Sequence, residues 1–135
     1  LEGIDKELAQ EFNEKLVPLS KMFEECHWTT LEKTPERILF HHPCHDRNGK
    51  DRDLLSSILK DRFQPANRGN CCGMGGVMQL AEPDIAQTIS SSCWQTMNAE
   101  SGDLVLTGCS GCILTLRATA PEGVQVAHWL DMIGK

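Results

Sequence analysis

Five of the seven cysteines in this chain follow one ordered pattern: a lone cysteine, a vicinal pair before a glycine, and a pair separated by two residues. They are Cys44, Cys71, Cys72, Cys109 and Cys112. Thiolate sulfur is a soft ligand that suits thiophilic metals and iron–sulfur clusters. The pattern therefore predicts a thiolate-bound metal or cluster, and with it electron or thiol chemistry rather than hydrolysis.

The vicinal pair Cys71-Cys72 is the sharper signal. Neighbouring side chains usually point apart, so two adjacent thiolates bind one small ion awkwardly, whereas a polynuclear cluster can take each sulfur on a different iron. Five sulfurs also exceed the four ligands of a tetrahedral zinc site. Iron–sulfur is therefore favoured, and zinc held by four of the five cysteines remains the alternative.

Taken alone, the pair Cys109-x-x-Cys112 does not distinguish between zinc, a cluster and a redox dithiol. At a junction of strand and helix, free N–H groups and the helix dipole stabilise a thiolate, so a redox dithiol is as compatible as zinc or a cluster. Glycines crowd both cysteine motifs and let backbone N–H groups approach anionic sulfur, which tunes the potential of a cluster. These glycines are Gly73, Gly75, Gly76, Gly108 and Gly111.

Other residues near the pattern have plainer interpretations. His41, His42 and His45 flank Cys44. A histidine at a strand end is more often a hydrogen-bonded core group than a ligand, although His42 or His45 could replace a cysteine in a zinc site. Cys26 and Cys93 fall outside the pattern and are interpreted as small buried hydrophobes. No catalytic residue is assigned.

Composition and charge limit the class of protein. With 135 residues, of which 40% are hydrophobic and 24% charged, the chain has the profile of one soluble globular domain. A net charge of −6 argues against nucleic-acid binding. There is no transmembrane run and no signal-peptide pattern, so the odd number of cysteines indicates a reducing cytoplasm. The chain begins with Leu1, and we expect a fragment of a larger protein.

The elements that position the cysteines alternate between helix and strand. The pattern predicts helices over 5–25, 51–63, 83–98, 113–118 and 128–133, strands over 37–42, 104–107 and 124–126, and an irregular strand over 64–70. Asp5 is the expected N-cap of the first helix, Gly102 is expected to end the third, and 71–76 form a tight loop. This order predicts a three-layer α/β sandwich with a small parallel sheet and helices on both faces.

The sheet edge brings the cysteines together. In open α/β sheets, ligands gather outside the carboxyl ends of the strands. Cys44 follows one expected strand, and Cys109 and Cys112 follow another, so three thiols reach one edge. The loop with Cys71 and Cys72 only has to fold over them.

Three motifs resemble the cysteine-rich CCG domain: His-Pro-Cys44-His, Cys71-Cys72-Gly-Met-Gly-Gly76 and Thr107-Gly-Cys-Ser-Gly-Cys112-Ile. That domain occurs in heterodisulfide reductase and its relatives, and in iron–sulfur subunits of glycolate, lactate and anaerobic glycerol-3-phosphate dehydrogenases. The resemblance implies an N-terminal helical segment over 1–30 and one CCG module over 31–135, similar to the C-terminal module of a larger protein.

The resemblance also implies a ligand set and partners. Carried over, the five cysteines of the pattern would hold a non-cubane [4Fe–4S] cluster, although zinc is associated with the motif in other members. Family members usually carry a second CCG module and a ferredoxin-like segment.

The function expected first is an electron-transfer module of an iron–sulfur subunit that serves a flavin-dependent 2-hydroxyacid dehydrogenase. The flavin would lie on a partner flavoprotein, and the complex would be cytoplasmic, held at the inner membrane only through its partners. The alternatives are a disulfide-reducing site like that of heterodisulfide reductase, and a structural zinc domain.

Overall fold

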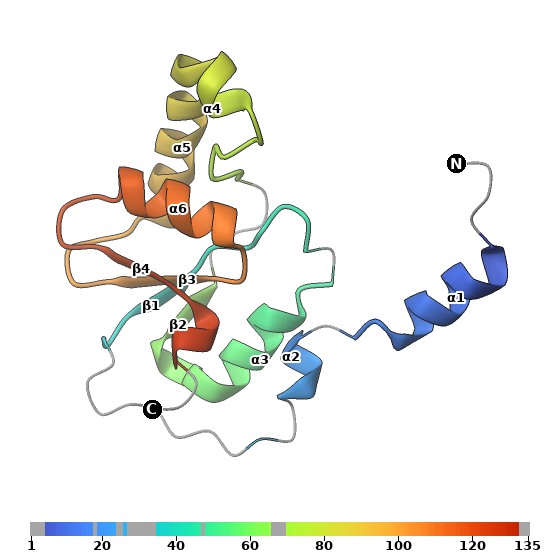
Figure 1. Cartoon of the computed structure of the whole chain (residues 1–135). Helices are drawn as coiled ribbons and strands as arrows, with labels where there is room; N and C mark the ends of the chain where they lie inside the picture. Colours follow the sequence, from blue (N-terminus) through green and yellow to red (C-terminus); the bar gives the residue numbers. More distant parts are fainter. Residues whose placement is uncertain are drawn as a thin grey trace.

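A four-stranded parallel sheet forms the centre of the molecule, with strand order β2-β1-β3-β4 (Figure 1). The structure, a computed structural model, describes residues 5–17, 19–23, 26, 35–46, 48–65 and 70–132. The strands are β1 (Ile38–Phe40), β2 (Phe63–Pro65), β3 (Leu104–Thr107) and β4 (Gln125–His128). β1 and β3 are buried throughout, as is typical of the largely apolar central strands of a parallel sheet.

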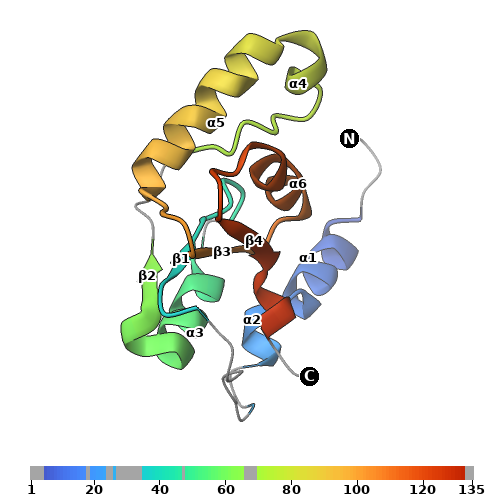
Figure 2. The ribbon, with the colours of Figure 1, turned by 90° about the vertical axis from the view of Figure 1, so that its left-hand side faces the viewer.

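Helices cover both faces of the sheet, which confirms the expected three-layer α/β fold (Figure 2). The covering elements are α3 (Lys50–Leu59) and the 3-10 helix η2 (Trp129–Met132) on one face, and α5 (Pro83–Met97) and α6 (Ser110–Thr119) on the other. Each face buries its own apolar cluster, so the sheet separates two cores.

Side chains alternate between these two cores along each strand, as the pleat of a strand demands. Phe40 and Leu106 pack in the core beside α3, whereas Leu39 and Val105 pack in the core beside α5 and α6. β1 and β3 pair in parallel with Phe40 opposite Leu106. The residues that follow each strand therefore have defined faces, which decides where the site lies.

The N-terminal part contains two short helices, α1 (Lys6–Lys15) and α2 (Leu19–Met22), in place of one helix over 5–25. Asp5 accepts hydrogen bonds from the N–H groups of Glu7 and Leu8, which confirms the N-cap. α1 buries none of its residues and extends away from the sheet (Figure 1). The helix ends at Lys15, because the backbone of Leu16 takes an extended conformation with ψ of 117°. Pro18 and residues 24 and 25 lie outside the described residues, as does the expected domain boundary at residue 30.

In the middle of the chain, the helices and strands begin or end at other residues than the sequence predicts. The helix expected over 51–63 ends at Leu59, because Lys60 takes a positive φ of 50°, and the 3-10 helix η1 (Lys60–Arg62) follows it. β2 then occupies 63–65, and residues 66–69 of the expected irregular strand lie outside the described residues. A short helix that the pattern missed, α4 (Met78–Ala81), packs against α5.

The helices and strands in the C-terminal half of the chain match the predicted ones more closely. α5 begins at Pro83 as expected, but its cap is Asn98 in the left-handed conformation, with φ of 48°, and not Gly102. α6 begins three residues earlier than residue 113, so Cys112 is helical. The closing segment is β4 followed by the 3-10 helix η2 instead of an α-helix. Among the described residues, no helix is long and apolar enough to cross a membrane.

Candidate metal centre

The site begins where β1 and β3 end side by side. From β1 the chain continues to β2 on one side, and from β3 it continues to β4 on the other, so the strand order reverses between them. Open α/β sheets bind ligands at such a switch point. His41 follows β1 directly, and Cys109 follows β3 after Gly108. The sheet therefore delivers both residues to the place where a ligand is expected.

The glycine-rich loop carries Cys72 into the core beside α5, and the expected tight loop is confirmed. Gly73 has a positive φ of 88°, and a Cβ there would lie 2.6 Å from the carbonyl oxygen of Ala86. The Gly73 N–H group donates to Cys71 Sγ at 3.4 Å. Only glycine fits so close to the helix in this conformation. Cys72 is thereby held in the interior, with 3% of its surface exposed.

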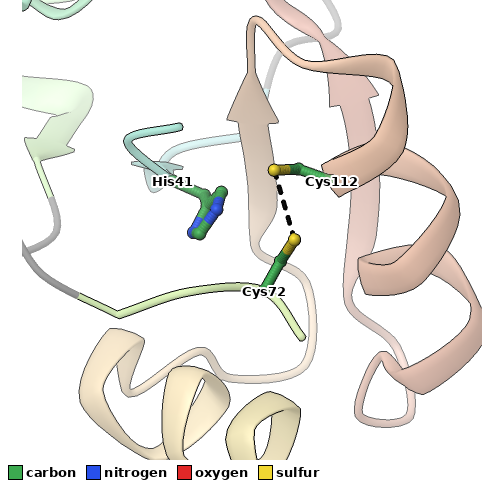
Figure 3. A group of neighbouring side chains, drawn as sticks. All are labelled: His41, Cys72 and Cys112. Atoms are coloured by element: carbon green, nitrogen blue, oxygen red, sulfur yellow. Dashed lines mark hydrogen bonds between the residues drawn. The ribbon is translucent and has the colours of Figure 1, made fainter. Parts of the chain in front are cut away.

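Cys72 and Cys112 meet beneath this loop (Figure 3). Their sulfur atoms lie 3.2 Å apart and share a hydrogen bond. Cys112 comes from the first turn of α6, whose N-cap is Cys109. One ring nitrogen of His41 and the two sulfur atoms all lie within 4.8 Å of one another, and all three residues are buried. These three side chains form a group that could hold a metal ion.

The contact between the two thiols separates their pKa values. The hydrogen bond with Cys112 lowers the pKa of Cys72 well below the ordinary thiol value, with a smaller contribution from the neighbouring imidazole of His41, although burial opposes it. The same hydrogen bond, together with burial, raises the pKa of Cys112 far above that value. At neutral pH the pair therefore shares one proton and carries one negative charge. A buried negative charge of this kind favours a bound cation.

Cys93 supports the site from α5. It is completely buried in the same apolar cluster as Cys72 and Cys112, which confirms its interpretation as a buried cysteine. Its Sγ also lies 3.6 Å from Nδ1 of His41, a contact that the sequence did not indicate. Burial, with the nearby charges of Cys72 and Cys71, raises the pKa of Cys93 to about 12.

The raised pKa of Cys93 predicts a loss of stability at alkaline pH in the metal-free protein. Its ordinary value is 9.0, and the folded value is about 12. The neutral thiol therefore stabilises the folded state fully below pH 9 and loses that contribution as pH rises toward 12, because the unfolded thiol ionises first. The slope should approach about 1.4 kcal/mol per pH unit, measured by urea unfolding over this range.

Cys93→Ala is the matched comparison, because alanine has no proton to lose. The advantage of the unmodified chain over this variant should shrink as pH rises above 9. Cys112 titrates alike in both proteins and cancels in the difference. Parallel pH profiles for the two proteins would contradict the assigned state of Cys93.

The other cysteines lie around this pair at different depths. Cys71 and Cys109 are half-buried, and Cys109 lies close enough to Cys112 to raise its pKa by a hydrogen bond and by charge. Cys44 is exposed beyond β1, and its sulfur is not part of the compact group found among the described residues. The five-sulfur ligand set therefore stays a prediction, with Cys72 and Cys112 at its centre.

Cys26 does not match its interpretation as a buried residue. It is exposed, because the short helix α2 already ends at Met22, so Cys26 does not lie on the packed face of a helix. His42 and His45 also lie apart from the buried group. His42 Nε2 pairs with the backbone oxygen of Asp46 at 2.6 Å, and His45 is exposed.

Two unpaired polar atoms show that the site suits a bound group. His41 Nε2 and Thr107 Oγ1 are buried and have no hydrogen-bond partner among the described residues. Buried polar atoms are nearly always paired, by protein, water or ligand. Soft thiolate sulfur beside the imidazole of His41 fits a thiophilic metal or an iron–sulfur cluster. Thr107 was not singled out from the sequence, although it is a polar residue that ends the apolar run Leu104–Leu106.

An open cleft lies at the same edge of the sheet. It is lined by the ends of three strand-to-helix connections, with His45, Asp51, Gly108 and His128 among its residues. Asp51 accepts a hydrogen bond from Trp129 Nε1 at 2.8 Å, which joins α3 to η2 across this edge. Asp51 lies on α3 and Trp129 belongs to the core beside α3, so this cleft opens on the other face of the sheet from Cys72 and Cys112.

Comparison with known proteins identifies a family and several relatives. The cysteine-rich domain family named CCG matches residues 38–117, more than half of the chain. The chain is 27% identical over 141 residues to a Bacillus subtilis protein named probable glycolate oxidase iron-sulfur subunit, an alignment that covers 94% of this chain and 32% of that protein. It is 30% identical over 107 residues to a fumarate reductase (CoM/CoB) subunit of Methanothermobacter marburgensis, covering 72% of this chain and 22% of that protein.

A third relative is an uncharacterized iron-sulfur protein of Methanocaldococcus jannaschii. The two are 35% identical over 86 residues, which cover 60% of this chain and 17% of that protein. The chain thus spans about a third or less of the length of these curated relatives. No solved structure matches it.

Proposed function

Because the chain belongs to the CCG cysteine-rich domain family, we propose that it is an electron-transfer module of an oxidoreductase and holds an iron–sulfur cluster. The observation that carries this proposal is the buried pair Cys72 and Cys112, with 3.2 Å between the sulfur atoms, beside His41 at the switch point of the sheet. Relatives named as iron–sulfur proteins support iron over zinc. A bound cluster supplies one-electron chemistry. The residues of the chain hold it, shield it from water and set its polar surroundings.

The proposed ligands are the five cysteines of the sequence pattern. Cys72 and Cys112 supply the buried centre, Cys71 and Cys109 flank it, and Cys44 completes the set from the loop after β1. Conventional clusters use four thiolates. A fifth sulfur therefore favours a non-cubane [4Fe–4S] cluster over a conventional one, and a zinc ion held by four of the five is the alternative.

The proposed parent protein is an iron–sulfur subunit that serves a flavin-dependent 2-hydroxyacid dehydrogenase. The name of the Bacillus subtilis relative supports this choice. A flavoprotein partner would oxidise glycolate or lactate, and this module would pass the electrons on to another carrier. We place the complex in the cytoplasm, at the inner membrane only through its partners.

A second CCG module and a ferredoxin-like segment are the proposed neighbours within the parent protein, since the relatives are about three times as long as this chain or longer. The surface around α4 suits the second module. Val77 is 74% exposed and Leu80 is 88% exposed. Apolar side chains so exposed favour a protein contact.

Disulfide reduction is the second candidate function. Cys109 is only half-buried, so a small disulfide could approach it from solvent, and one relative is named for coenzymes M and B. Two electrons and two protons would cleave the S–S bond and give two thiols, with the electrons supplied one at a time through the site by a reduced carrier. Fast reduction of a low-molecular-weight disulfide by the pre-reduced protein would favour this candidate over electron transfer alone.

Anaerobic reconstitution with iron and sulfide tests the primary proposal. We expect a brown protein that retains iron and acid-labile sulfide after desalting, since a cluster contains both. A colourless protein that takes up zinc but no sulfide would contradict the electron-transfer function and support a structural zinc domain.

A further inference from the structure

Two polar side chains at the ends of the central strands each contain a buried atom without a hydrogen-bond partner among the described residues. His41 comes directly after β1, and Thr107 is the last residue of β3. His41 is 3% exposed and Thr107 is completely buried. Nε2 of His41 and Oγ1 of Thr107 have no hydrogen-bond partner among the described residues. A buried polar group without a hydrogen bond costs free energy, and apolar residues at these two positions would avoid that cost. The presence of two polar residues here therefore requires an explanation.

The register of the sheet places these two residues side by side. Phe40 lies opposite Leu106, so the next pair along the two strands is His41 and Thr107, and the N–H group of His41 donates to the carbonyl oxygen of Leu106 at 2.9 Å. Phe40 and Leu106 face α3. By the alternation of a strand, His41 and Thr107 face the other core, which contains Cys72 and Cys112.

The position of the imidazole is fixed by its contacts. Nδ1 of His41 lies 3.6 Å from Sγ of Cys93, and one ring nitrogen lies within 4.8 Å of the sulfur atoms of Cys72 and Cys112 (Figure 3). The ring is therefore held between α5 and the cysteine pair. Sulfur of a thiolate or of an inorganic sulfide accepts hydrogen bonds, and donors aimed at it stabilise added negative charge.

We propose that His41 and Thr107 donate hydrogen bonds to sulfur of the iron–sulfur centre held by Cys72 and Cys112, and that they raise its reduction potential. This inference rests on the proposed function. The reduced centre is more negative than the oxidised one, so two donors favour reduction. Neither residue is a ligand of iron. Both are positioning residues that set how readily the centre accepts an electron.

Thr107→Val is the cleanest test, because valine keeps the shape of threonine and removes the hydroxyl donor. His41→Phe removes the imidazole, and His41→Asn replaces it with another side chain that can donate. We expect Thr107→Val and His41→Phe to bind as much iron as the unmodified protein but to show more negative reduction potentials. His41→Asn should recover part of the shift. The potentials are read from redox titrations followed by electron paramagnetic resonance.

Thr115→Val is the matched control. Thr115 is a buried threonine in α6, and its hydroxyl is already engaged by the Gln79 side chain at 3.0 Å and by Met74 Sδ at 3.3 Å. This variant should leave the reduction potential unchanged. If His41→Phe fails to fold, Thr107→Val and the control still decide the question.

The outcomes separate this inference from the proposed function. An unmodified protein that takes up no iron and sulfide would refute the function itself, and the inference with it. A loaded protein whose potential is the same in Thr107→Val and in His41→Phe would overturn the inference and leave the function standing. Strong nitrogen coupling in pulsed spectra of the loaded protein would show direct ligation by His41, and would also overturn it.

Discussion

Replacing Cys72 with serine is expected to abolish cluster loading. Cys72 is 3% exposed, its sulfur lies 3.2 Å from that of Cys112, and its low pKa supplies the thiolate charge of the buried pair. A serine hydroxyl stays protonated at neutral pH and is a hard, weak ligand for iron. Changes that only reorient ligands already cost metal affinity about tenfold or more, so loss of a central ligand should cost at least that much.

Iron and sulfide per chain, measured after anaerobic reconstitution, check this result. Cys26→Ser is the matched control, because Cys26 is exposed and lies outside the cysteine pattern. The control should load as the unmodified chain does. Equal iron content in Cys72→Ser and Cys26→Ser would show that the vicinal pair is not bound to the cluster, and the five-sulfur model would be wrong.

The sequence was sufficient to predict the edge of the sheet at which Cys109 and Cys112 lie. Apolar runs before His41 and before Gly108 predicted two buried strands, and parallel strands bring their carboxyl ends to one edge. Cys109 and Cys112 had to follow the second strand. The meeting of Cys72 and Cys112 depends on a loop that folds back over this edge, and the glycines indicated the turn but not its direction.

The features that the sequence did not reveal depend on tertiary contacts. Whether Thr107 and His41 face the cysteines or α3 follows from the register between β1 and β3, which a single strand pattern does not define. The contact of Cys93 with His41 joins residues 52 positions apart in the chain. Cys26 is exposed because of where α2 ends, and residue type alone favours burial for cysteine.

Gly73→Ala is expected to destabilise the protein strongly and to displace Cys72. Gly73 has a φ of +88°, and a Cβ there would lie 2.6 Å from the carbonyl oxygen of Ala86 and 3.3 Å from the backbone nitrogen of Ser90. The backbone strain costs about 1–2 kcal/mol. Overpacking against the fixed backbone of α5 adds about 1–3 kcal/mol. A total of about 2–5 kcal/mol is a large share of the stability of a small domain.

Gly76→Ala separates the two causes, because Gly76 also has a positive φ, of +58°, but a Cβ there would meet nothing within 4 Å. This control should lose only the strain of about 1–2 kcal/mol in urea unfolding. The loop can relieve the clash at Gly73 only by moving away from α5, and Cys72 precedes Gly73 directly. Gly73→Ala should therefore also bind less iron, whereas Gly76→Ala should load normally. Equal losses of stability in the two variants would mean that the loop does not rest on α5, and that another contact holds Cys72 against Cys112.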